Sequence, residues 1–280
     1  MEPIDFMERW RLVVEARRRQ TDAAHARLGR TTHDYWARRA GRFAAFFRED
    51  RPDPFLDKVL AHVDDQSTVL DVGAGTGRHS VPLARTVRRV IAVEPSPAMA
   101  SRLREWAREE GLANIELIEG TWPEVDAPTC DVVICSHVLY PIADIEPFLR
   151  KLDSSARRYC FLWLHEEQMA LESLELWERF HGERRARQPT FRDALPVLWQ
   201  MGLRPNLEMT AIPQGWSWES MDEAAQGFRE HLAIPEDEST EARLRQMLAA
   251  ALVEREGRLY LPKTTYRSAI VWWGKEDPGR

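Results

Sequence analysis

The stretch VLDVGAGTG, residues 69–77, decides the fold class of this chain. It is an apolar run that carries one acid, Asp71, and it ends in glycines at alternating positions. Such a run predicts a buried strand that turns tightly and leaves its backbone open to a ligand. The dinucleotide fingerprint G-x-G-x-x-G would need a further glycine where this chain has Arg78, which disfavours a NAD-dependent dehydrogenase.

A second apolar run, RVIAVE, ends at Glu94. An acid at the carboxyl end of a second strand can accept hydrogen bonds from both ribose hydroxyls of a nucleoside. Pro97 suits the first turn of a helix, where its missing N–H costs nothing, and Gly111 suits the residue just beyond the helix end. These signals predict a helix over residues 97–110.

Strands and helices alternate regularly along the middle of the chain. Further strands are predicted over residues 115–120, 130–140, 158–164, 206–212 and 264–273. This alternation predicts an α/β fold with a parallel sheet and right-handed crossovers.

An acid followed by G-x-G-x-G, with Glu94 after the second strand, resembles the class I S-adenosylmethionine-dependent methyltransferases of the small-molecule type. The resemblance is good over residues 65–165 and looser elsewhere. It implies a seven-stranded, mostly parallel sheet with helices on both faces, strand seven antiparallel beside strand five, and a helical lid. It also implies S-adenosyl-L-methionine as the cofactor.

The resemblance assigns roles to residues of the glycine loop and the strand ends. Asp71 and the loop would hold the methionine end of the cofactor, and Glu94 the ribose diol. Arg78 would either neutralise the methionine carboxylate or face solvent. The predicted cofactor-binding set is Asp71, Gly73, Ala74, Gly75, Gly77, Arg78, Glu94, Pro95, Met99, Thr121, Trp122 and Ser136.

The expected adenine contacts depart from the family pattern. The family usually has Gly-Asp-Ala after strand three, where this chain has Gly120-Thr121-Trp122. Thr121 could accept a hydrogen bond, and Trp122 could lie against the adenine ring. Met99 would contact adenine or pack in the core. We therefore expect the adenine contact to matter less than the ribose contact.

Three side chains are candidates for acceptor positioning or proton removal. His137 and Tyr140 follow strand four, and His165 follows strand five. The carboxyl ends of these strands open onto the reaction centre in open α/β sheets. Histidine titrates near neutral pH and can act as a base, although packing between a strand and a helix explains each histidine as well. The family has no fixed catalytic base, so the resemblance supplies none.

The chain divides into an N-terminal helical lid section, residues 1–62, and a cofactor-binding domain, residues 63–280, with helical insertions near 165–190 and 213–257. Predicted helices in these parts cover residues 5–19, 32–47, 54–62, 165–181, 190–201, 219–232 and 241–256. Trp36, Ala40, Phe43 and Phe47 share a face of the second of these helices. They would cover the cofactor or pack on the sheet.

The composition of the chain indicates its expected cellular compartment and the kinds of partner it could bind. The formal net charge is −6, and the arginine-dense stretches are dispersed among acids, which favours solvated helix faces over a nucleic-acid surface. The three cysteines fall in predicted buried strands, and no histidine or cysteine pairs have metal-ligand spacing. With no secretory leader or long apolar stretch in the sequence, we expect a cytoplasmic protein without a membrane segment or a metal site.

The sequence favours an enzyme that methylates a small, apolar or aromatic molecule. Methylation of RNA or protein is a second hypothesis, although Ser136-His137-Val138-Leu139 replaces the Asn/Asp-Pro-Pro-aromatic motif of N6-adenine and amide methylation. A non-catalytic, cofactor-binding regulatory protein is a third hypothesis. The acceptor, its reacting atom and the oligomeric state stay open.

Overall fold

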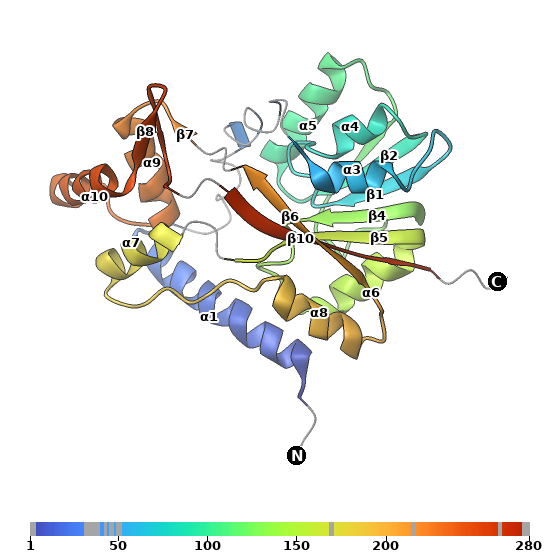
Figure 1. Cartoon of the computed structure of the whole chain (residues 1–280), viewed down its shortest axis with the longest axis horizontal. Helices are drawn as coiled ribbons and strands as arrows, with labels where there is room; N and C mark the ends of the chain where they lie inside the picture. Colours follow the sequence, from blue (N-terminus) through green and yellow to red (C-terminus); the bar gives the residue numbers. More distant parts are fainter. Residues whose placement is uncertain are drawn as a thin grey trace.

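The computed structural model describes residues 4–30, 40, 41, 44, 48, 52–167, 171–213, 217–262 and 265–275, and only the backbone of residues 171–174. The chain forms two lobes, one built on a large twisted sheet and one mostly helical (Figure 1). None of the described helices combines the length and the apolarity needed to span a lipid bilayer.

The large lobe is built on a seven-stranded sheet. Its strands are β1 (Thr68–Val72), β2 (Arg89–Glu94), β3 (Ile115–Glu119), β4 (Cys130–Ser136), β5 (Ala156–His165), β6 (Asn206–Pro213) and β10 (Thr265–Gly274). Their order is β3-β2-β1-β4-β5-β10-β6, in which the first five strands are parallel and β10 is antiparallel to both β5 and β6. The predicted α/β fold with an antiparallel last strand beside strand five is therefore confirmed.

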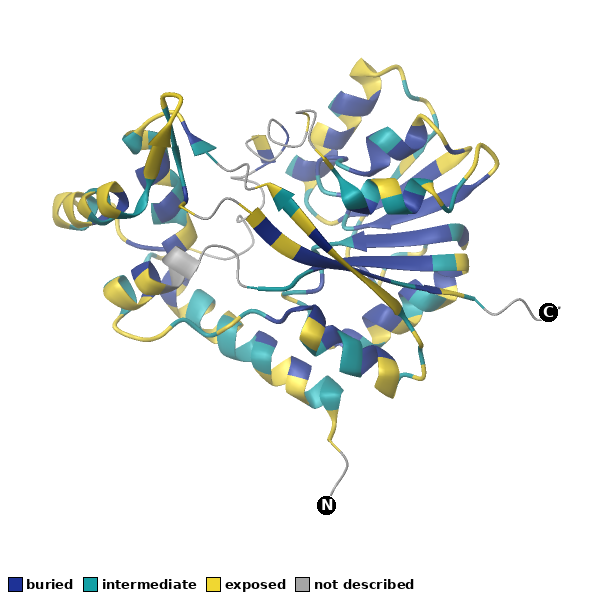
Figure 2. Cartoon of the chain, viewed as in Figure 1, coloured by how far each residue is buried: buried dark blue, intermediate teal, exposed yellow. Residues whose placement is uncertain are grey.

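Helices cover both faces of this sheet, as predicted. The helices around it are α1 (Phe6–Arg27), α3 (Pro54–Leu60), α4 (Ser80–Ala84), α5 (Pro97–Glu109), α6 (Ile145–Ser155) and α8 (Phe191–Gln200). Leu70 and its neighbours on one face pack in a core with α1, α6 and α8, whereas Val69 on the other face packs with α3 and α4. β1 is buried along its whole length, and most of β4 and β5 is dark blue in Figure 2, because helices cover both faces of the sheet there.

The small lobe has its own hydrophobic core. It contains α7 (Leu171–His181), α9 (Met221–Leu232), α10 (Glu238–Ala251), β7 (Ser217–Trp218), β8 (Val253–Arg255) and β9 (Arg258–Tyr260). Trp177, Trp218 and Phe228 are buried together there with Ala24 of α1. Because α1 also buries Trp10 in the core of the large lobe, this one helix joins both cores.

Three predicted helix boundaries are wrong. The helix expected over residues 5–19 continues to Arg27. Residue 165 belongs to β5, so the helix expected from 165 begins later. The helix expected over residues 241–256 ends at Ala251 and is followed by the β8–β9 hairpin. Glu256 and Gly257 both have positive φ, at 50° and 72°, which suits a two-residue hairpin turn rather than a helix end.

Several predicted lid residues lie outside the described part of the chain. Trp36, Phe43 and Phe47 of the helix expected over residues 32–47 belong to this group. Ala40 and Ala44 of the same stretch are described, and both are buried. The division into a lid of residues 1–62 and a domain of residues 63–280 stays a prediction.

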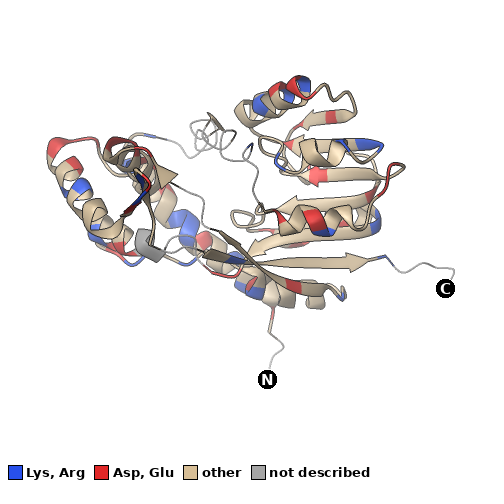
Figure 3. Ribbon diagram, turned by 45° about the horizontal axis from the view of Figure 1, so that its top comes forward, with Lys and Arg blue, Asp and Glu red and all other residues tan. Residues whose placement is uncertain are grey.

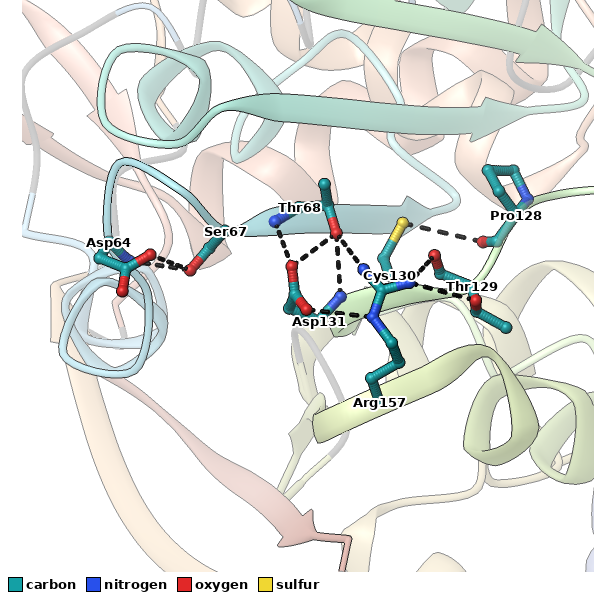
Figure 4. A network of polar contacts seen from close by, with 8 residues as sticks. All are labelled: Asp64, Ser67, Thr68, Pro128, Thr129, Cys130, Asp131 and Arg157. Atoms are coloured by element: carbon teal, nitrogen blue, oxygen red, sulfur yellow. Dashed lines mark hydrogen bonds and ion pairs between the residues drawn. The ribbon is translucent and has the colours of Figure 1, made fainter.

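A polar network joins β1, β4 and β5 at their amino-terminal ends (Figure 4). The Asp131 carboxylate accepts hydrogen bonds from the Thr68 backbone N–H and hydroxyl, both at 2.7 Å, and from Arg157 Nε at 3.1 Å. Arg157 also donates to the Thr68 hydroxyl at 2.8 Å. Burial raises the pKa of Asp131, but these donors outweigh it and lower the pKa to about 2.

Replacing Asp131 with alanine should lower the free energy of unfolding at pH 7 by about 1–2 kcal/mol, because the Thr68 N–H loses its acceptor. Since the folded-state pKa lies below the ordinary 3.8, wild-type stability from this carboxylate is present above pH 4 and is lost as the pH falls towards 2. Urea unfolding at pH 7 and pH 3 measures both effects. Glu105→Ala, which breaks an exposed pair with Arg102, is the matched control and should change stability by less than about 0.5 kcal/mol.

Candidate cofactor and acceptor site

The glycine loop folds back over the end of β2. The backbone N–H groups of Gly73 and Ala74 both donate to the Val93 carbonyl, at 2.8 and 3.0 Å. The loop glycines Gly73, Gly75 and Gly77 have φ values of +77°, +58° and +97°. These are left-handed conformations that side chains with a Cβ rarely adopt.

The three glycines differ in what surrounds them. A Cβ at Gly73 would overlap a methyl group of Val138, and a Cβ at Gly77 would lie 3.0 Å from Val81. These two glycines therefore serve close packing within the protein. A Cβ at Gly75 would meet no atom within 4 Å. Gly75 is thus the glycine whose bare backbone faces open space.

Two carboxylates flank this loop. Asp71, 1% exposed in β1, accepts a hydrogen bond from the Ser80 hydroxyl at 2.6 Å. Glu94, 6% exposed at the end of β2, accepts hydrogen bonds from the backbone N–H groups of Gly75 and Ser96, both at 2.8 Å. Burial raises the pKa of both acids, and the charge of Asp71 raises that of Glu94 further. Buried carboxylates of this kind favour a ligand that brings positive charge or hydrogen-bond donors.

Arg78 lies in a partly buried charge cluster. Its Nε donates to Asp53 Oδ2 at 2.8 Å, and His79 Nε2 lies 3.3 Å from the same oxygen. Burial raises the pKa of Asp53, but the charges of His79 and Arg78 outweigh it and hold the pKa far below its ordinary value. The Arg78 side chain is 20% exposed, and its guanidinium carbon lies 4.7 Å from the Trp163 ring centroid. Arg78 is thus held beside Asp53, and its contact with a methionine carboxylate stays a prediction.

The three acceptor-side candidates come together at the ends of β4 and β5. The His137 and His165 rings stack, with centroids 4.1 Å apart and planes at 20°. The Tyr140 ring stacks on His165 at 5.1 Å, and the Trp163 ring lies 4.8 Å from His137. His137 has a φ of 58°, an unusual conformation for a residue other than glycine. Strained residues of this kind cluster at functional sites.

Hydroxyl groups hold both imidazole rings. The Tyr140 hydroxyl accepts the backbone N–H of His165 at 2.8 Å and lies 2.8 Å from His137 Nδ1. The Ser268 hydroxyl, from β10, lies 3.4 Å from His165 Nδ1. Burial is the main cause that lowers the pKa of His137 well below its ordinary value and that of His165 to about 4. Both rings are therefore neutral at physiological pH.

Comparison with known proteins matches part of the large lobe to a family of methyltransferases. Residues 69–158 match a family described as a methyltransferase domain. Residues 69–158 therefore form a domain similar to the class I S-adenosylmethionine-dependent methyltransferases. The fold of the YcgJ protein from Bacillus subtilis aligns with a TM-score of 0.54 and 16% sequence identity, covering 78% of this chain and 96% of that protein.

The curated relatives are similar over part of their length. A probable ribosomal RNA small subunit methyltransferase A from Methanosarcina mazei is 41% identical over 91 residues, which are 32% of this chain and 32% of the relative. A ubiquinone biosynthesis O-methyltransferase from Rickettsia felis is 27% identical over 126 residues, 43% of this chain and 51% of the relative. The chain thus spans about a third to a half of the length of these two methyltransferases.

The residues around the glycine loop fit S-adenosyl-L-methionine, the cofactor of this methyltransferase family. When bound, this cofactor supplies a methyl group on a positively charged sulfur. The chain supplies the buried negative charge of Asp71, the open backbone face at Gly75 and the carboxylate oxygens of Glu94. Each carboxylate oxygen carries two lone pairs, so Glu94 can accept ribose hydroxyls while it holds the loop.

The other residues predicted to bind the cofactor differ in their exposure to solvent. Met99 is buried in the first turn of α5, Pro95 and Thr121 are exposed, and Ser136 is half-buried at the end of β4. The Trp122 indole N–H donates to a backbone carbonyl of α6 at 3.2 Å, and its ring is buried in the main core. This placement favours packing as the role of Trp122, and its contact with adenine stays a prediction.

Asp53, His79, Trp163 and Ser268 are site residues that the sequence analysis missed. Asp53 has a local signal, because it precedes Pro54 and caps α3 by accepting the Leu56 N–H. That signal predicts a helix start and not a partner for Arg78. Ser268 comes from β10 and reaches His165 only because β10 pairs with β5.

Proposed function

We propose that this methyltransferase transfers the methyl group of S-adenosyl-L-methionine to a small-molecule acceptor. The observation that carries the proposal is the arrangement of Asp71, Gly75 and Glu94: two buried carboxylates flank the one loop glycine whose Cβ position faces open space. Methyl transfer by in-line displacement chiefly requires that donor and acceptor be held close and aligned. This arrangement is suited to hold the donor.

The proposed cofactor contacts follow from these positions. Asp71 and the glycine loop hold the methionine end, and Glu94 accepts the ribose hydroxyls. Arg78, fixed by Asp53, is the proposed partner of a carboxylate near the loop. Met99, Thr121 and Ser136 complete the set by resemblance to the family.

The acceptor side supports a small molecule. Its described wall consists of the rings of His137, Tyr140, Trp163 and His165, which offer flat, neutral surfaces. Acidic and basic residues are interspersed over the helices of both lobes in Figure 3, and the formal net charge is −6. A nucleic-acid surface would instead concentrate basic residues on one face.

Methyl-transfer assays distinguish a small-molecule acceptor from RNA or protein. The full-length protein is incubated with methyl-labelled S-adenosylmethionine and, separately, with total RNA, total protein and a low-molecular-mass metabolite extract of the source cells. We expect label to enter the low-molecular-mass fraction in a time-dependent manner. Label in nuclease-sensitive or protease-sensitive material would overturn the small-molecule proposal, and cofactor binding without labelling of any fraction would support a regulatory protein instead.

A further inference from the structure

In each of the stacked imidazole rings of His137 and His165, the Nδ1 atom lies next to a hydroxyl group. The Tyr140 hydroxyl already accepts the His165 backbone N–H, so its proton is available for His137 Nδ1. The Ser268 hydroxyl lies 3.4 Å from His165 Nδ1, a longer contact in which its rotatable proton can be donated to this nitrogen. Because a neutral imidazole carries one proton, both rings then carry it on Nε2. Among the described residues, neither Nε2 atom has a hydrogen-bond partner.

The charges around this pair disfavour a cation. The pKa of His165 is lowered by burial and by the charge of Arg78. The pKa of His137 is lowered by burial, by the repulsion that a protonated His165 would add, and by Arg78 and His79. Asp53 lies behind Arg78 and His79 and pairs with both, and no carboxylate among the described residues raises the pKa of either imidazole. Burial disfavours a charge of either sign, but the positive charge of Arg78, which also lowers both pKa values, stabilises a negative charge beside the rings.

We propose that His137 and His165 form a paired N–H donor that binds an anionic oxygen of the methyl acceptor, so that the substrate is a phenol, enol or carboxylic acid and not an amine. Tyr140 and Ser268 are positioning residues that fix the tautomer of each imidazole. The inference rests on the proposed function, because it names the acceptor of the same site. An amine nucleophile is itself a hydrogen-bond donor and finds no acceptor in such a pair.

The transfer then needs no general base at the moment of reaction. The acceptor binds as an oxyanion, having lost its proton to water before binding. A bond forms between its oxygen and the methyl carbon while the carbon–sulfur bond breaks and its electron pair stays on sulfur. The products are a neutral methyl ether or ester and a neutral thioether, and no proton moves in this step.

The ionisation of 4-nitrophenol tests the donor pair, because its ionised form absorbs visible light and its neutral form does not. The full-length protein is saturated with S-adenosylhomocysteine, and the absorbance of bound 4-nitrophenol is followed against pH. We expect the site to lower the apparent pKa of the bound phenol by about one unit, a tenfold shift in ionisation. The same shift should be absent when boiled protein replaces the native complex.

Two variants test whether the hydroxyl groups of Tyr140 and Ser268 orient the imidazole rings or only fill space beside them. Tyr140→Phe and Ser268→Ala each free one imidazole, and each should reduce the shift by at least about half while the affinity for S-adenosylhomocysteine stays unchanged. Tyr159→Phe, on the same strand as His165 but away from the pair, is the matched control and should keep the full shift. Thermal melts check folding, and Ser268→Ala keeps the test decisive if Tyr140→Phe unfolds.

The outcomes distinguish the two proposals. S-adenosylhomocysteine binding without a shift in 4-nitrophenol ionisation, or a shift that survives in both variants, overturns the donor pair and leaves the proposed function standing. Absence of S-adenosylhomocysteine binding overturns the proposed function and the donor pair together.

Discussion

Replacing Gly73 with alanine should lower the free energy of unfolding by about 3 kcal/mol. The residue has a φ of +77°, and a Cβ there would overlap a methyl group of Val138. The left-handed conformation costs roughly 1–2 kcal/mol for a residue with a Cβ, and overpacking adds about 1–3 kcal/mol. Chemical denaturation of the wild type and the variant, followed by circular dichroism, measures the difference.

Gly75→Ala is the matched control in the same loop. With a φ of +58°, an alanine at this position would still be destabilised by the left-handed backbone conformation. No atom lies within 4 Å of the added Cβ, however, so there is no overlap. Stability should therefore fall by only about 1–2 kcal/mol, whereas S-adenosylhomocysteine affinity should fall roughly tenfold because the Cβ occupies the open face proposed for the ligand. Equal stability losses in the two variants, or unchanged affinity in Gly75→Ala, would contradict these separate roles.

Replacing Glu94 with alanine should reduce the affinity for S-adenosylhomocysteine by about 10- to 100-fold. A hydrogen bond to a charged group contributes roughly 1.5–3 kcal/mol, and Glu94 is the proposed acceptor of the ribose hydroxyls. The carboxylate also holds the Gly75 N–H at 2.8 Å, so its loss loosens the loop as well. Isothermal titration of folded variants gives the two dissociation constants.

Thr121→Ala is the comparison for Glu94→Ala, because Thr121 stands where the family usually has an adenine-binding acid. Its side chain is exposed, so the substitution should leave the fold intact and reduce the affinity for S-adenosylhomocysteine by less than Glu94→Ala does. Glu94→Gln removes the negative charge but keeps a side chain of similar size. This variant should also bind S-adenosylhomocysteine more weakly than the wild type if the charge is what matters. A larger loss from Thr121→Ala than from Glu94→Ala would show that the adenine contact dominates.

The sheet and the approximate positions of the site residues could be predicted because their signals are local. Alternating apolar runs, glycines and acids at strand ends place Asp71 and Glu94 beside one loop as soon as the strands pair in parallel. The β8–β9 hairpin could not be predicted in the same way, because VEREGRLY also suits a helix end. Only the left-handed conformations of Glu256 and Gly257 distinguish the two.

The partners of the site residues could not be predicted, because they are set by tertiary packing. Asp53 reaches Arg78 from the start of α3, and Ser268 reaches His165 from the last strand. Trp122 follows strand three, and its indole N–H donates to a backbone carbonyl of α6 while its ring packs in the main core. Each of these contacts joins elements that are far apart in the sequence, and their spacing along the chain does not indicate that they touch.

Isothermal titration of the purified protein with S-adenosylhomocysteine tests the central claim most directly. We expect saturable binding at one site per chain that is abolished or strongly weakened in Glu94→Ala, and far weaker binding of NAD. Absence of binding at about 1 mM S-adenosylhomocysteine, or tighter binding of NAD, would contradict it.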